Sequence, residues 1–492
     1  MLYYGIAAGM VGLIAFGMLS PRIKVLIAFF VMTSCFDLIP RILFKIDVWD
    51  VGAILLLIAW LHLAFLKTTV STSTIGYVVI LRVILGWMVL CLLWSVLIYE
   101  YPVLNSLKAS RQMIIGVFSF FVFKELFTVD EGAYGFFMKA LYAATFALLP
   151  VCLVQFVLHK PLLFGLYREY GDVIRSLPIF LPLVLLYVWI ILSKVLTATR
   201  ISMHELLYAG MAGAVTVLTF TRGIYLSVLF VSGVMLFVLA LKKSPVNIKL
   251  NFVVVPILFI LLMLCGLGLY FSGNADKVVE RFTSAVELVV GQKAKTNKNN
   301  EDTYTGRLGI AKERFMLVLA HNPVVGYGFM HEDDVPRALR ARFEYGSVIY
   351  TPEYVERYKA GYPYVLALHS ADIGWADIMI NTGLVGLALW LALCAVFIAN
   401  FYTTAGQTPA AYYHARLAHF LQIVVGMLLM FESNTFVNLV HIPAFLIAGY
   451  WYCANEQPEV ESGSVLGASS EVTFAAIGVP GKPWLNRKLG EP

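Results

Sequence analysis

Apolar residues dominate this chain in long, uninterrupted stretches, and polar residues gather in the segments between them. The stretches are apolar on every side of a helix, whereas strands of a membrane barrel would alternate apolar and polar positions. About 20 helical residues cover the hydrocarbon core of a bilayer, where helices satisfy all of their own backbone groups. The pattern predicts spanning helices near residues 2–19, 25–40, 50–66, 76–98, 112–127, 134–158, 177–193, 205–220, 223–241, 252–272, 375–400, 416–432 and 436–453.

These stretches predict an all-α polytopic membrane protein with twelve or thirteen transmembrane helices. Two places are ambiguous. The second stretch contains Asp37 and Pro40, and the last two stretches are separated only by residues 432–434. At either place a re-entrant hairpin is an alternative to a full span.

The composition agrees with a bilayer protein and excludes an ordinary soluble one. Mean hydropathy is +0.81, and only 13% of residues are charged, against roughly a quarter in a soluble domain. The net charge of +6 is spread over many short loops, so no nucleic-acid partner is expected. The six cysteines lie in or at the ends of apolar stretches without metal or redox spacing, and we interpret them as small core residues.

One long polar segment divides the helices. Residues 1–272 hold about ten predicted spans, residues 273–374 form a large loop, residues 375–453 hold the last spans, and residues 454–492 are a polar tail with little predicted order. The loop carries 13 basic and 13 acidic residues, which indicates a small polar subdomain. Connections of this length are usually functional.

The orientation follows from basic residues, because Lys and Arg in short loops prefer the cytoplasm. One side of the predicted bundle receives the tail together with Arg22, Lys24, Lys67, Lys194, Arg200, Lys242, Lys243, Lys249 and Arg416. We therefore expect the large loop on the opposite, outer side. Several basic residues fall on that outer side against the rule: Arg41, Lys45, Lys108, Arg111, Lys160, Arg168 and Arg175.

Two arginines are candidates for holding an anionic substrate. Arg222 follows an apolar stretch at the predicted outer edge of the bundle, and Arg307 opens an amphipathic helix predicted from Gly309 to Leu319. A guanidinium can grip a phosphate with two parallel hydrogen bonds and stays charged. The alternatives are ordinary: an interfacial arginine that reaches the headgroups, and a solvated arginine in a loop.

A histidine stands directly before the span that follows the loop. Histidine is a residue type that suits a general base on a sugar hydroxyl, and Asp372 stands one helical turn after His369. If this segment is helical, the two side chains share a face. A histidine that only forms hydrogen bonds at the interface is the alternative. Earlier in the loop, Gly326 and Gly328 let the backbone turn sharply or approach a ligand closely.

Taken in order, these features resemble the O-antigen ligase and O-antigen polymerase superfamily. The resemblance covers about residues 205–453 and rests on the order and placement of short motifs, none of which is specific alone. They are Arg222-Gly223, Gly306-Arg307, Asn322-Pro323 with Gly326-Tyr327-Gly328, His369-Ser370, and Gly383-Leu384-Val385-Gly386.

The resemblance implies a glycosyltransferase of the bacterial inner membrane with a glycosyltransferase C-like fold. It would move a glycan from an undecaprenyl-diphosphate carrier to an acceptor hydroxyl, as a polymerase or ligase in O-antigen, lipopolysaccharide or exopolysaccharide synthesis. Arg222 and Arg307 match the arginines that hold the diphosphate, His369 matches the base, and no metal or other cofactor is implied. Other polysaccharide assembly proteins are expected partners.

The interval from Ser370 to Gly383 is longer than in the family by nearly one helical turn. Counting the family's interval back from Gly383 reaches Asp372, which is therefore a substitute or partner for His369. A transporter or flippase of lipid-linked oligosaccharide or polysaccharide is the alternative from another class. It would use Arg82 and Arg222 along a polar path and would give the large loop no catalytic part.

Overall fold

The computed structural model confirms an all-α architecture with several helices of spanning length. It describes residues 15–43, 46–66, 76–130, 132–158, 160–170, 173–197, 199–241, 276, 279, 315–316, 318–320, 322–330, 374–404 and 410–429. Its helices are α2 (Pro21–Met32), α3 (Ser34–Asp37), α4 (Val48–Leu66), α5 (Gly76–Leu97), α6 (Val103–Val129), α7 (Ala133–Leu158), α8 (Leu181–Leu196), α9 (Met203–Val217), α10 (Arg222–Ala240), α16 (Gly374–Thr404) and α17 (Ala410–Leu429). Among the described residues, α4, α5, α6, α7 and α16 are long and apolar enough to cross a bilayer.

The helices lie where the apolar stretches predict them, because each is apolar around most of its circumference. In α5, Val79, Val83 and Leu90 are exposed, while Val78, Leu81 and Cys91 are fully buried. A soluble helix would carry polar groups on its exposed side. The exposed apolar side chains therefore fit contact with lipid. Predicted spans at residues 2–19, 252–272 and 436–453 lie largely or wholly outside the described residues.

The second predicted span is shorter than expected. Its helix, α2, ends at Met32, and the Thr33 hydroxyl donates to the carbonyl of Phe30 (2.9 Å). Residues 34–37 then adopt φ values between 49° and 65°, which β-carbon sterics disfavour. The turn places Asp37 where its carboxylate accepts the Ile179 N–H (2.7 Å). The polar residue that makes this stretch ambiguous in the sequence is thus the one that holds the turn.

Two short antiparallel hairpins accompany the helices, and the hydrophobic pattern does not predict them. Strand β1 (Ile42–Leu43) pairs with β2 (Ile46–Asp47), and β3 (Leu166–Tyr170) pairs with β4 (Val173–Leu177). Both lie between helices in segments that the sequence assigns to loops.

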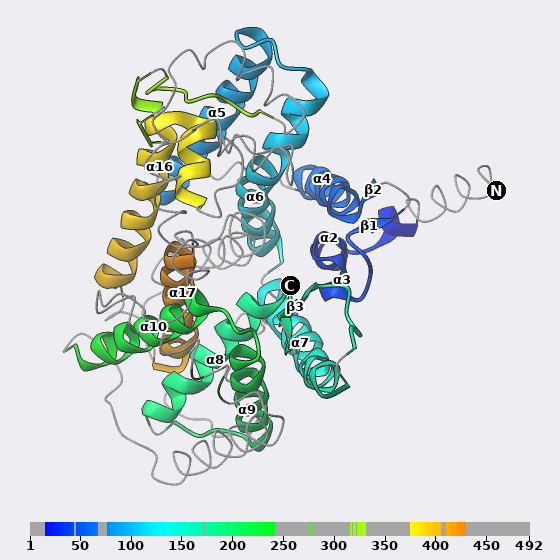
Figure 1. Ribbon diagram of the computed structural model, residues 1–492, viewed down its shortest axis with the longest axis vertical. Coiled ribbons are helices and arrows are strands. Elements are labelled where there is room, and N and C mark those ends of the chain that lie inside the picture. Colours follow the sequence, from blue (N-terminus) through cyan, green and yellow to red (C-terminus); the bar gives the residue numbers. More distant parts are fainter. Residues whose placement is uncertain are drawn as a thin grey trace, which may run out of the picture.

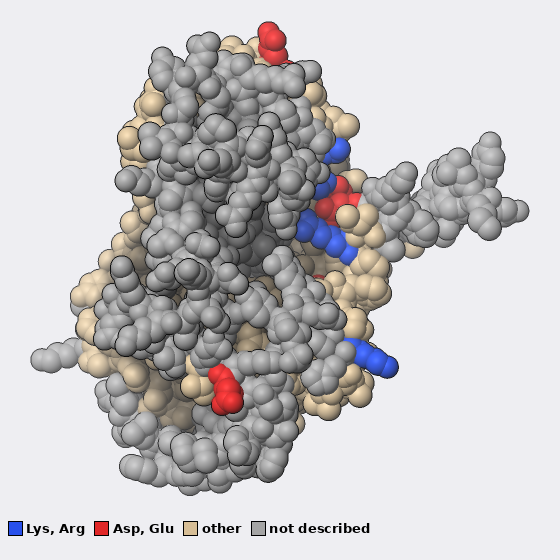
Figure 2. Space-filling model, viewed as in Figure 1, with Lys and Arg blue, Asp and Glu red and all other residues tan. Residues whose placement is uncertain are grey.

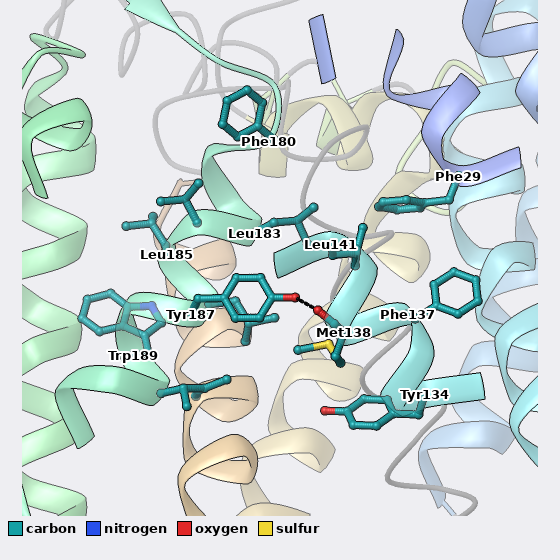
Figure 3. Close-up of a cluster of buried hydrophobic side chains, with 14 of the residues drawn as sticks. Phe29, Tyr134, Phe137, Met138, Leu141, Phe180, Leu183, Leu185, Tyr187 and Trp189 are labelled. Carbon is teal, nitrogen blue, oxygen red and sulfur yellow. Dashed lines mark hydrogen bonds between the residues drawn. The ribbon is translucent and has the colours of Figure 1, made fainter. Parts of the chain in front are cut away.

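The helices form one bundle with an extensive apolar core. In Figure 1, α5 and α16 lie side by side in the upper half, and α8, α9, α10 and α17 occupy the lower half. Figure 3 shows part of the core, where side chains of α2, α7 and α8 meet. There the Tyr187 hydroxyl donates to the carbonyl of Met138 (2.7 Å), so a fully buried phenol is satisfied.

Contacts between helix termini define one end of the bundle, which we call the loop face. The loop face contains the first residues of α4 and α6, which the pair of Asp50 and Arg111 joins. It also contains the last residues of α5 and the first residues of α16, near the contact of Trp87 with Thr382. At the opposite end, Lys194 pairs with Glu205 (2.6 Å), and Glu205 also accepts the Ser202 N–H at the start of α9. Successive described helices therefore alternate in direction.

Basic residues on the loop face are neutralised locally. Arg111 of α6 pairs with Asp50 and with Asp47 (3.1 Å), and Arg41 lies 3.6 Å from Asp47. The Arg111 guanidinium also lies over the Trp49 ring. In Figure 2, blue and red atoms lie next to each other on the flank that carries β1, β2 and α4 in Figure 1. Arg41 and Arg111 are among the basic residues predicted on the outer side, and the two carboxylates offset their charge.

Close approach of α2 and α4 gives a test of this packing. A β-carbon at Gly52 would overlap the backbone and side chain of Met32, whereas one at Gly86, inside α5, would meet open space. We expect Gly52→Ala to destabilise the protein by about 1–3 kcal/mol through overpacking. Gly86→Ala is the control and should be neutral or stabilising by up to about 1 kcal/mol. Thermal unfolding of the detergent-solubilised protein measures both, and equal midpoints would contradict the close packing.

Candidate functional site

The motif after the predicted loop helix folds back onto the bundle at the loop face. We call residues 322–330 the return segment. Residues 315–316 and 318–320 are helical, in agreement with the predicted helix, and the Asn322 N–H donates to the carbonyl of Val318 (3.0 Å). The segment then turns, and residues 326–330 are buried. The middle of the large loop is therefore anchored against the transmembrane helices.

Two glycines of the return segment adopt the left-handed conformation. Gly326 and Gly328 both have φ of 71°, which residues with a β-carbon adopt at a cost. A β-carbon at Gly326 would overlap the Ile380 carbonyl and the Gly383 nitrogen, and one at Gly328 would overlap the Ser95 hydroxyl. These glycines therefore allow backbone to approach backbone. Their close partners are helices of the same chain.

Helix α16 is interrupted where the return segment meets it. In an uninterrupted helix, the Leu384 N–H would donate to the Ile380 carbonyl. Here Gly383 has φ of 68° and ψ of −170°. The Tyr327 N–H donates to the Ile380 carbonyl (2.7 Å), and the Leu384 N–H donates to the Pro323 carbonyl (2.8 Å). The return segment thus enters the break and satisfies the Ile380 carbonyl and the Leu384 N–H, which no longer bond to each other.

The other glycine of the Gly383-Leu384-Val385-Gly386 motif makes room for a side chain. The Thr382 hydroxyl donates to the Ile378 carbonyl (2.6 Å) and lies against Gly386, where a β-carbon would overlap it. The Thr382 carbonyl accepts the indole N–H of Trp87 (2.9 Å). Both glycines of the motif are therefore explained by the break in α16.

Helix α5 holds the return segment from the other side. The Ser95 hydroxyl accepts the Phe329 N–H (2.7 Å) and donates to the Cys91 carbonyl (2.7 Å). The Tyr99 hydroxyl donates to the Gly326 carbonyl (2.8 Å). The segment is thus clamped between α5 and α16, and we call this arrangement the clamp.

Apolar side chains close the clamp. The return segment contributes residues that are at most 3% exposed, and they pack with residues of the loop helix, of α16 and of the segment after α5. The cluster comprises Tyr101, Val318, Tyr327, Met330, Met379 and Ile380. Burial of several large side chains at roughly 1.5–3 kcal/mol each gives this contact a large apolar contribution. The first turn of α16 has a further hydrogen bond, from the Trp375 indole to the Met427 carbonyl of α17 (3.3 Å).

The return segment and the break in α16 lie inside a stretch that matches a known family. The family model described as O-antigen ligase matches residues 207–391. This part of the chain is similar to the O-antigen ligase family. The match confirms the resemblance drawn from the short motifs, and with the apolar helices it indicates a multi-pass membrane enzyme of the glycan ligase or polymerase type. No curated protein matches the chain.

The O-antigen ligase stretch contains all four predicted site residues, and the structure describes one of them. Arg222 is the first residue of α10, directly after Thr221 at the N-cap, so the prediction that it opens a helix is confirmed. Arg307, His369 and Asp372 lie outside the described residues. Asp372 stands two positions before Gly374, where α16 begins.

The structure brings together two of the motifs that carry the resemblance. Asn322-Pro323 with Gly326-Tyr327-Gly328 docks onto Gly383-Leu384, although more than 50 residues separate them. The hydrophobic pattern does not single out Trp87 and Ser95 of α5, nor Tyr99, which follows α5. Ser95 and Tyr99 stand near the end of an apolar stretch, where polar residues are common, and no local signal distinguishes them.

Replacing Gly383 tests the clamp of the O-antigen ligase stretch. In Gly383→Ala the β-carbon would overlap the Val324 carbonyl, and φ of 68° would be strained, so we expect the return segment to undock. Tyr327 is 3% exposed, so chymotrypsin can cleave after it only when the return segment undocks. Strain of about 1–2 kcal/mol at residue 383 would increase the undocked fraction, and cleavage in the folded protein should become at least tenfold faster. Gly233→Ala in α10, whose surroundings are open, is the control. Equal cleavage of the two variants would contradict the clamp.

Proposed function

We propose that this protein is a glycosyltransferase of the bacterial inner membrane that moves a glycan from an undecaprenyl-diphosphate carrier to a sugar hydroxyl. The observation that carries the proposal is the O-antigen ligase match over residues 207–391, since this stretch contains Arg222, Arg307, His369 and Asp372. The docking of the family's glycine motifs onto each other supports it. The reaction would make or attach O-antigen or exopolysaccharide, as a polymerase or as a ligase.

In the proposed reaction the acceptor oxygen attacks the anomeric carbon of the donor. The new bond joins that carbon to the acceptor oxygen, and the bond between the carbon and the diphosphate oxygen breaks. The diphosphate leaves with the bonding electron pair, and the acceptor proton passes to a base. The main catalytic demand is the negative charge that develops on the leaving group. Preorganised cations in a partly dehydrated site can meet it, and the proposal includes no metal ion.

Arg222 and Arg307 are the proposed diphosphate ligands. Arg222 supports this role by its place at the first position of α10, where free backbone N–H groups and the helix dipole also favour an anion. The loop-face position of that terminus follows from the alternating helix directions. Arg307 precedes, in the sequence, the helix that leads into the return segment.

His369 is the proposed base, and Asp372 is its partner or its substitute. Both precede α16 by a few residues, and the first turns of α16 are fixed by Trp87, Trp375 and the return segment. A base must lie within hydrogen-bond reach of the acceptor hydroxyl. In this proposal the large loop is a lid on the periplasmic or extracellular side, over a lateral opening for the lipid, and other polysaccharide assembly proteins deliver or receive the glycan.

Purified protein supplied with lipid-linked donor and acceptor tests the reaction directly. We expect product formation in the presence of EDTA. His369→Ala should reduce turnover by about 10²- to 10⁴-fold, which is the usual contribution of a general base, while binding of lipid-linked glycan persists. The Asp372→Ala variant shows whether the carboxylate shares this task. Full turnover in both variants would overturn the proposed base.

The same assay distinguishes a transporter. A flippase or exporter would move lipid-linked glycan across proteoliposomes without forming a glycosidic bond. Product formation by the purified chain is incompatible with transport alone, and movement without product would overturn the enzyme proposal.

Lysine substitutions test the arginines while retaining the charge. An ammonium lacks the planar fork that binds two phosphate oxygens, so Arg222→Lys and Arg307→Lys should each reduce kcat/KM by at least about tenfold, the effect of one charge-assisted hydrogen bond. Arg200→Lys, at the opposite end of the bundle between α8 and α9, is the matched control and should retain the activity. Unaltered kcat/KM in either test variant would remove that arginine from the diphosphate site.

A further inference from the structure

Helix α5 and Tyr99, which follows it, lie outside the O-antigen ligase match, yet they make three of the hydrogen bonds that build the clamp. Trp87 donates to α16, Ser95 accepts from the return segment, and Tyr99 donates to the return segment. These bonds connect residues more than 200 positions apart in the chain. The matched stretch therefore depends on a helix that the family model does not cover.

Ser95 uses both of its hydrogen-bonding functions in a fully buried position. Its side chain is 0% exposed. Its hydrogen is directed to the Cys91 carbonyl within α5, which leaves a lone pair for the Phe329 N–H. An alanine here would leave that N–H buried without an acceptor, which is costly in an apolar surrounding. The loss would fall on the return segment, because α5 keeps its own backbone hydrogen bonds.

The break in α16 can close when the return segment leaves. Rotation of Gly383 to helical dihedral angles would restore the bond from Leu384 N–H to the Ile380 carbonyl, so the two backbone bonds to the return segment are partly replaced within the helix. The exchange of these bonds favours neither state strongly. The contacts with α5 and the apolar cluster therefore decide which state is populated.

Closing the break would redirect the start of α16. Gly383 separates the first nine residues of the helix, 374–382, from the rest. A change of its dihedral angles rotates this part of α16 relative to the remaining helix. His369 and Asp372 stand directly before this part of α16 in the sequence.

We propose that Ser95 and Tyr99 are positioning residues for the glycan transfer: by holding the return segment in the break of α16, they fix the first turns of α16, which follow His369 and Asp372 in the sequence. This inference rests on the proposed function. Neither residue touches the substrate in this account. They act through the Phe329 N–H and the Gly326 carbonyl.

The test combines amide exchange with kinetics in the full-length protein. In Ser95→Ala, hydrogen–deuterium exchange of the peptide containing residues 323–330 should become at least tenfold faster. With undecaprenyl-diphosphate-linked glycan as donor, kcat should fall by roughly ten- to a hundredfold, the cost of a base displaced by about 1 Å. KM for the donor should change less than kcat, because Arg222, one of the two proposed diphosphate ligands, is on α10 outside the clamp. Tyr99→Phe removes one hydroxyl and should give the same pattern with a smaller loss.

Ser119→Ala in α6 is the matched control. Ser119 is also 0% exposed, and its hydroxyl donates to the Gly116 carbonyl within its own helix (2.6 Å). It should leave exchange of residues 323–330 and kcat unchanged. If the unaltered protein forms no product, the proposed function fails, and the positioning role fails with it. If the unaltered protein is active and Ser95→Ala and Tyr99→Phe keep its kcat, the positioning role alone is wrong.

Discussion

The arrangement of the loop face depends on an exchange of backbone hydrogen bonds. A transmembrane helix normally pairs every N–H with a carbonyl one turn earlier, because lipid offers no alternative partner. At Gly383, α16 breaks this pattern, and the return segment supplies the missing donor and acceptor through Tyr327 and Pro323. A break at this depth is tolerated only where protein covers it. The return segment in the middle of the large loop and the start of α16 are consequently a single structural unit.

Glycine has a specific part in this exchange. Gly326, Gly328 and Gly383 all adopt positive φ, and each lies where a β-carbon would overlap backbone or a buried hydroxyl. Their small size matters as much as their dihedral angles, because the two backbones must approach within hydrogen-bonding distance. The Gly-x-x-Gly motif extends the same logic, since Gly386 accommodates the Thr382 side chain.

The sequence predicted the positions of most helices and the family, but only part of the site. Apolar length predicts a span well because bilayer thickness is fixed, so α5 and α7 begin and end within one residue of their predicted limits. The same criterion was wrong at residues 33–40. There the buried Asp37 carboxylate holds a turn by accepting the N–H of Ile179, which is 142 positions away. The glycines at 326 and 328 predicted a sharp turn or a close approach, and the close partners are α16 and α5. Ser95 and Tyr99 could not be predicted, because hydrophobic periodicity contains no information on which distant segment a buried polar group meets.

The contacts of α5 show that the matched stretch, residues 207–391, does not contain every residue that holds the return segment in place. A chimera that received residues 207–391 from another member of the family would keep its glycine motifs but would meet a foreign α5. For the return segment to dock, the exchanged part would have to include α5 and the residues after it. Otherwise the recipient chain would need compatible substitutions at Trp87, Ser95 and Tyr99. Loop and α5 are thus expected to vary together among related enzymes, even where the loop changes to accept a different glycan.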